Sequence, residues 1–196
     1  MADTGNLSFA TAANVDDSTG SSWATPNNSK DDDGVNFTTC SLTDGGHSDY
    51  DKLTNPGSHG MPDGSTINGI QVDIKRKASL NGVDDQITDR HVYIVVGGTI
   101  QTTWTDLKAA TVWPTTNTNK TYGGSSQLWG NPGTWAVSDF DSGFGVAISV
   151  NATATVANIA SIDYISVKIY YTPAGYPAMR KSVTIRLFGH TGQNIF

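Results

Sequence analysis

The sequence predicts an all-β fold of antiparallel strands, and three observations predict it. Short stretches in which apolar and polar residues alternate recur along the chain, as expected of strands with one buried face. Glycine is frequent, with 21 residues, and Ser, Thr, Asn and Asp fill the gaps between apolar stretches, a composition typical of short strands joined by turns. No stretch has helical periodicity over three turns. The 196 residues suffice for one such domain, which we place at residues 1–172.

Residues 161–172 form the clearest predicted strand, because alternation and β propensity agree over its whole length. One face carries Ile165, Val167, Ile169 and Tyr171. The other face carries Tyr164, Ser166, Lys168 and Tyr170. A face that mixes aromatic rings with a lysine is typical of a half-solvated or partner-facing sheet surface. We therefore take Tyr164 and Tyr170 as candidate partner-binding residues.

Four further strands are predicted, over residues 37–42, 67–77, 91–96 and 144–150. In the second, Ile70, Val72 and Ile74 should point inward. In the last, Phe144, Val146, Ile148 and Val150 should point inward, and Gly145, Ala147 and Ser149 outward. That outward face is flat and uncharged, so it suits packing against a neighbouring subunit or cover by a loop of the same chain. The first 20 or so residues either begin the domain or form an extended arm.

Two polar segments invite a metal-binding interpretation. Asp31, Asp32 and Asp33 are adjacent, but calcium loops space their carboxylates differently, so a solvated turn is expected. His47 and His59 are twelve residues apart, which fits no compact ligand motif. We expect no metal and no cofactor.

The long segment 99–140 holds four of the five tryptophans: Trp104, Trp113, Trp129 and Trp135. They either plug the ends of a β-sandwich or stack on sugar rings or on a protein partner, and plugging is the favoured interpretation. The cluster Lys75, Arg76 and Lys77 fits either charges that protect an edge strand or a binding patch.

Charge and cysteine content exclude several classes of function. Residues 1–172 carry nine basic and 18 acidic residues, a balance of −9, so direct binding of nucleic acid is not expected. The single cysteine, Cys40, cannot form an intrachain disulfide and is expected to be a buried thiol. The chain has no leader and no apolar run of spanning length, which predicts a soluble protein made in a cytoplasm.

Residues 173–196 form a separate segment beyond Pro173 and Pro177, which would stop any strand. The segment is basic and contains an alternating apolar stretch. We expect it to dock on a neighbouring subunit, by adding a strand to a sheet edge, or to return as a last edge strand of its own sheet. Its candidate partner-binding residues are Arg180, Lys181, Val183, Ile185, Arg186, Leu187 and Phe188.

Several motifs occur in an order that resembles a group of tailed-bacteriophage virion proteins. They are Met61-Pro-Asp-Gly-Ser-Thr-Ile-Asn-Gly-Ile-Gln-Val, Val83-Asp-Asp-Gln-Ile-Thr-Asp, Tyr122-Gly-Gly with Leu128-Trp-Gly, Phe144-Gly-Val and Ile162-Asp-Tyr-Ile-Ser-Val-Lys-Ile-Tyr-Tyr-Thr. The resemblance spans roughly residues 23–172. It implies a jelly-roll-like antiparallel β-sandwich, here with an extended C-terminal arm, in a capsid decoration (cement) protein or a fibre component, commonly trimeric.

The first functional hypothesis is therefore a cement protein on the virion surface, with the major capsid protein as partner and a homotrimer as its own assembly. The alternative is a fibre, tail receptor-binding or carbohydrate-binding module that presents its tryptophans to glycans. Exposed tryptophans would favour the alternative, and buried ones the first hypothesis. An enzyme is not expected, because the sequence has no Gly-x-Ser-x-Gly motif, no close histidine pair and no histidine near Cys40. The sequence does not exclude a glycosidase-type pair of catalytic carboxylates, because such residues can be far apart in the chain and meet only in the fold.

Overall fold

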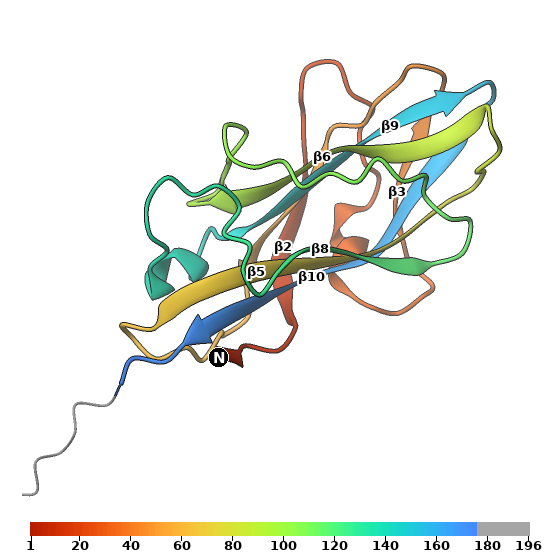
Figure 1. The fold of residues 1–196 in the computed structure, drawn as a ribbon. Helices are drawn as coiled ribbons and strands as arrows, with labels where there is room; N and C mark the ends of the chain where they lie inside the picture. Colours follow the sequence, from red (N-terminus) through yellow and green to blue (C-terminus); the bar gives the residue numbers. More distant parts are fainter. Residues whose placement is uncertain (176–196) are drawn as a thin grey trace, which may run out of the picture.

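The computed structural model describes residues 1–175 and confirms the all-β prediction (Figure 1). Ten strands and two short 3-10 helices follow one another along this part of the chain. Their bounds are β1 Ala2–Asp3, β2 Leu7–Val15, η1 Pro26–Lys30, β3 Thr38–Leu42, β4 Tyr50–Pro56, β5 Thr66–Ala78, β6 Asp85–Val96, β7 Thr99–Ile100, β8 Thr118–Gly124, η2 Val137–Phe140, β9 Gly145–Ala154 and β10 Asn158–Thr172.

The strands form one curled antiparallel sheet in the order β7-β6-β9-β4-β2-β10-β5-β8, and β1 and β3 also pair with β10. Strand β2 contributes to both halves: its first residues pair with β10, and the remainder pairs with β4. We call the half with β1, β3, β5, β8 and β10 sheet A, and the half with β4, β6, β7 and β9 sheet B. Figure 1 shows β5, β8 and β10 lying opposite β6 and β9. Apolar side chains from both halves belong to one buried core cluster.

Strand β10 is the central element of sheet A. It pairs with β5 from Ala160 to Thr172, and its other edge pairs with β1, β2 and β3. The predicted inward residues Ile165, Val167 and Ile169 belong to the core, as alternation requires. A bulge between Ile162 and Tyr164 interrupts the pairing with β5. The sequence prediction for this strand is confirmed in its type and its inward face, whereas Ser166 on the other face is buried rather than half-solvated.

The tryptophans of segment 99–140 fill the core rather than the surface. Trp113 and Trp129 are completely buried, Trp135 is 8% exposed, and Trp104 is half-buried and packs edge-on against Trp135. Trp135 also contacts Phe140 and Phe144 at one end of the sandwich. The burial of these rings confirms the plugging interpretation. Rings of this size, once buried, supply much of the hydrophobic stabilisation.

Two expectations about the strands need correction. The outward residues of β9 do not form a free face, because Gly145, Ala147 and Ser149 are buried in this chain. They are small, and in the register of the sheet they lie opposite larger residues of β4 and β6, such as Lys52, Tyr93 and His91. The charges of β5 are not on an edge strand, because β5 lies between β10 and β8.

The N-terminal residues form β1 and β2, which pair with β10 and β4, so they belong to the sheet and not to an arm. Figure 1 places the N-terminus beside the end of β10. Strands β2, β4 and β8 lie in segments for which the sequence predicted no strand. Within residues 1–175, no helix is long and apolar enough to span a bilayer.

Candidate functional site

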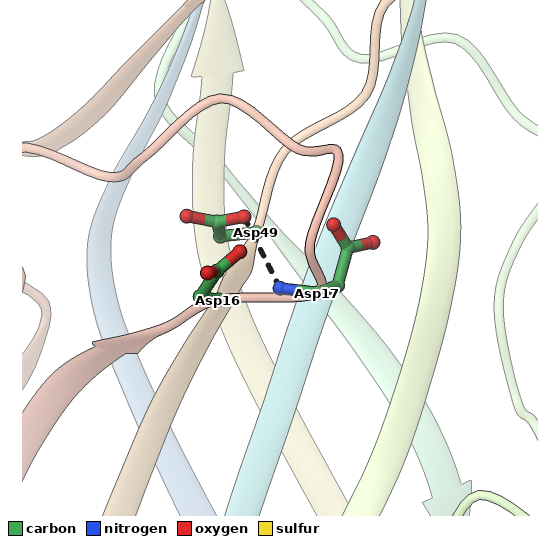
Figure 2. A group of neighbouring side chains, drawn as sticks. All are labelled: Asp16, Asp17 and Asp49. Atoms are coloured by element: carbon green, nitrogen blue, oxygen red, sulfur yellow. Dashed lines mark hydrogen bonds between the residues drawn. The ribbon is translucent and has the colours of Figure 1, made fainter.

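The structure brings three carboxylates together at one corner of the sandwich: Asp16 and Asp17, which follow β2, and Asp49, which precedes β4 (Figure 2). One oxygen from each residue lies within 4.8 Å of the others. We call this group the acidic corner. Sequence reasoning missed it, because 31 residues separate Asp49 from its nearest member and only the pairing of β2 with β4 brings them together.

The carboxylates of the acidic corner already have donors within this chain. Asp49 accepts hydrogen bonds from Asn14 Nδ2 (2.8 Å), Ser22 Oγ (3.0 Å) and the Asp17 N–H (3.3 Å), the last drawn in Figure 2. Asp16 accepts from the Ser18 N–H at 2.6 Å. These bonds close the turn after β2 onto the start of β4.

Asp17 is the member of the corner with a cationic partner. Its Oδ2 forms an ion pair with Arg90 and lies 3.3 Å from His47 Nε2, and its Oδ1 accepts from the N–H groups of Thr19 and Gly20. Burial opposes its ionisation, but Arg90 and the two N–H groups outweigh that effect and hold the pKa of Asp17 below its ordinary value. The corner therefore holds the loop after β2 against the loop before β4 and against Arg90 of β6, and its oxygens are largely occupied.

The two predicted histidines lie apart from each other. His47 borders the acidic corner, 3.3 Å from Asp17, and is bridged to Asn151 of β9, whereas His59 contacts Asp141 at 3.2 Å, just before β9 begins. Asp31, Asp32 and Asp33 are exposed, as expected of a solvated turn. Asp33 accepts from the N–H groups of Val35 and Asn36, which lowers its pKa and explains its place in the turn.

The outer face of sheet A carries the two candidate tyrosines. Tyr170 donates a hydrogen bond to Gln71 Oε1 (2.8 Å), and Gln71 Nε2 donates to Asp73 (2.8 Å). Asp73 also accepts from Thr121 and Asn119 of β8. Tyr164 and Tyr170 are both half-buried. This face is thus a continuous row of hydrogen-bonding side chains across β10, β5 and β8, with part of each tyrosine ring open to solvent.

A buried ion pair joins the two halves of the sandwich. Arg76 of β5 contacts Asp89 of β6, and both side chains are essentially without solvent exposure. Asp89 accepts further bonds from Trp113 Nε1, Tyr122 Oη and the Ala109 N–H, each at 2.8 Å. The Arg76 guanidinium lies 4.6 Å from the centre of the Trp113 ring. Arg76 is therefore a core residue, and the binding-patch interpretation of the Lys75 to Lys77 cluster is wrong for its central member.

A Ser, a His and an Asp meet on the outer face of sheet B, which sequence reasoning did not anticipate. His91 Nδ1 lies 2.8 Å from Asp106 Oδ2, and Ser149 is opposite His91 in the β6–β9 register. The rings of His91, Tyr93 and Tyr50 form a three-membered cluster, with each pair of ring centres 5.1–6.3 Å apart. However, Ser149 is fully buried, and within residues 1–175 its hydroxyl has no hydrogen-bond partner. Without a bond to His91 the hydroxyl is not activated as a nucleophile.

Two further titratable groups, Cys40 and Asp51, are buried. Burial, reinforced by Asp49, raises the pKa of the Cys40 thiol to about 12, which confirms the expected buried, free thiol. Burial also raises the pKa of Asp51 to about 7. Neither Asp51 oxygen has a hydrogen-bond partner in the part of the chain described. The neighbouring hydroxyl, Ser29 Oγ, donates instead to the Pro26 carbonyl at 2.8 Å.

The remaining candidate residues, Arg180, Lys181, Val183, Ile185, Arg186, Leu187 and Phe188, lie outside the described residues. Comparison of the chain with protein-family models, with curated proteins and with solved structures finds no match.

Proposed function

We propose that the chain is a structural protein of a phage virion, a capsid decoration protein that binds the lattice of the major capsid protein and stabilises it. The observation that carries this proposal is the burial of the tryptophans. Trp23, Trp113, Trp129 and Trp135 are at most 8% exposed, and each indole N–H donates to a group of the same chain. These rings are committed to the core and are not a platform for sugars.

The way in which the loops are held supports the same proposal. Lys75 contacts Asp32 and the buried Asp163, and Asp163 also accepts from the Gly34 N–H and from Asn117 Nδ2. Two loops are thereby fixed to sheet A. A protein whose loops are held in this way keeps one surface conformation. Such a pre-organised surface lowers the entropic cost of binding to a capsid lattice.

A homotrimer is part of the proposal, with the outer face of sheet A as the contact surface. The β9 face no longer supports an interface, because it is covered, but Tyr164 and Tyr170 offer aromatic surface beside Lys168. Interface cores are enriched in such rings. Sedimentation of the recombinant chain at micromolar concentration should give three times the monomer mass, and Tyr170→Arg should shift it to monomer. A wild-type monomer would contradict a stable free trimer.

Quantitative mass spectrometry of purified virions tests the function itself. A decoration protein should be present in hundreds of copies per particle, in fixed ratio to the major capsid protein. Incubation of stripped capsids with the purified chain should restore that ratio and raise the temperature at which the particles release their genome. Absence of the chain from virions would overturn the proposal.

A second candidate function, a glycan-binding fibre or tail module, is favoured by one observation. The outer face of sheet A aligns Gln71, Asp73, Asn119 and Thr121 beside Tyr170, a set of donors and acceptors that suits sugar hydroxyls. Host-surface glycans should then bind the wild type and not Tyr170→Ala, whereas Leu128→Ala should bind normally. In that case virions should contain a few dozen copies or fewer.

A further inference from the structure

A small apolar hollow lies at the end of the sandwich where β10 ends. Its volume is about 270 Å³, and it is lined by Ser65, Thr66, Ile67, Leu128, Gly133, Thr134 and Trp135. Leu128 is 40% exposed, although most large apolar side chains in the described chain are buried. Trp135 Nε1 donates to the Leu128 carbonyl at 3.0 Å, so the indole and the leucine are fixed relative to each other. The hollow is therefore preformed, and it lacks an apolar cover.

The chain leaves the sheet beside this hollow. Thr172, the last residue of β10, pairs with Thr66, one of the lining residues. Two residues later Ala174 approaches Gly64, where an added Cβ would lie 3.6 Å from the Ala174 Cβ. Residues 176–196 follow, and at roughly 3.3 Å per residue seven of them can span about 20 Å. A segment beginning near residue 183 can thus reach the hollow of its own molecule.

Charge is complementary between this end of the sandwich and the sequence that follows it. Residues 53–70 and 121–144 contain Asp63, Asp139 and Asp141 and no lysine or arginine, although Lys52 and Lys120 directly precede the two ranges and Asp141 contacts His59 at 3.2 Å. Residues 176–196 contain Arg180, Lys181 and Arg186 and no acidic residue. Opposite charges attract over about one Debye length, roughly 8–10 Å at moderate salt.

We propose that the hollow at Leu128 and Trp135 binds the apolar residues Val183, Ile185 and Leu187 of the same chain. Tethering places this segment at an effective concentration in the millimolar range, so a weak apolar contact is enough to hold it. This inference does not rest on the proposed function, because it concerns the isolated chain.

Disulfide trapping in the full-length chain tests the proposal. The test variant carries Leu128→Cys and Leu187→Cys, and the control carries Val83→Cys and Leu187→Cys. Val83 is 87% exposed in the turn at the opposite end of β5, and Cys40 is buried and does not compete. Under mild oxidation the test pair should form an intramolecular disulfide at least about tenfold faster than the control, as expected from the difference in local concentration.

Three outcomes are distinguishable on a non-reducing gel. A fast disulfide in the monomer band supports the proposal. Equal rates for the two pairs would overturn it, and a dimer band for the test pair would assign the hollow to the segment of a second copy and overturn it as well. Replacing Arg180, Lys181 and Arg186 with glutamate should slow trapping several-fold.

As a second measurement, removal of residues 176–196 should shift the methyl resonances of Leu128 and leave those of Val83 unchanged.

Discussion

At the scale of single residues, Asp51 is the most unusual group in the core. It lies on the inner face of β4, in register with Asn14 and Ile148, fully buried and without a hydrogen-bond donor in the described chain. A carboxylate in such a place is costly, so the group keeps its proton to higher pH. Its pKa rises from an ordinary 3.8 to about 7.

The sign of the resulting pH dependence follows from this rise. Below pH 4 the carboxyl is protonated in both the folded and the unfolded chain, and its contribution to stability is fully present. Between pH 4 and 7 the unfolded chain releases the proton and the folded chain keeps it, so the free energy of unfolding falls as pH rises. The loss between pH 5 and 8 should be about 2–3 kcal/mol.

Asp51→Asn should remove this dependence, because the amide does not titrate. We expect the variant to lose about 2–3 kcal/mol less stability than the wild type between pH 5 and pH 8, measured by urea unfolding. Asp31→Asn, which changes an exposed acidic residue, serves as the control and should leave the slope unchanged. The same slope in Asp51→Asn and the wild type would show that Asp51 is ionised in the fold.

The acidic corner gives a prediction about metal. Because Arg90 neutralises Asp17 and protein donors occupy Asp49, calcium should add little. The melting temperature should be the same in EDTA and in millimolar calcium, whereas Arg90→Ala should lower it. A rise of several degrees with calcium would show that the corner is a cation site.

At the scale of elements, the Arg76–Asp89 pair holds β5 of sheet A against β6 of sheet B. Asp89→Ala would leave a buried guanidinium without its counter-ion and three donors without an acceptor, so we expect a loss of about 3–5 kcal/mol. Arg76→Met should cost roughly half as much, because Asp89 keeps Trp113, Tyr122 and the Ala109 N–H as donors. Urea unfolding of both variants measures the difference. An equal or larger loss for Arg76→Met would contradict this ranking.

The elements also show how far the sequence could predict the fold. Strands β5, β6, β9 and β10 were predictable, because each alternates branched apolar residues with polar or small ones. Strand β4 was not, since its inward positions include Asp51. In β2 most residues are small, and in β8 only Tyr122 is buried.

The sites were less predictable than the strands, because their residues are far apart in the sequence. Asp89 contacts Arg76, Trp113 and Tyr122 only once the two halves of the sandwich have packed together. The covered face of β9 shows the opposite error. Gly145 and Ala147 looked like a free flat surface, yet small residues in a central strand are easily covered by their neighbours.

At the scale of the whole molecule, the described residues already form a complete curled sheet around a core of their own. Strand β10 pairs on both edges, and β2 links the two halves of the sandwich. One edge of sheet B is extended by the loop after β7, where Gln101, Leu107 and Trp113 donate backbone hydrogen bonds to β6. The core cluster contains residues from both halves and ends with Ile169.

Deletion of residues 176–196 should therefore leave the sandwich folded. We expect the truncated chain to be soluble, to show the β-type circular dichroism of the full chain, and to melt within a few degrees of it, because every core residue between Phe9 and Ile169 is retained. The deletion uncovers at most the hollow at Leu128, whose burial is worth about 25 cal/mol per Å² of apolar surface, a small part of the total. If the truncated chain is instead insoluble or melts tens of degrees lower, residues 176–196 complete the core, and the proposed contact with the hollow at Leu128 must be abandoned. If it folds but no longer decorates stripped capsids, the segment carries the attachment while β10 carries the fold.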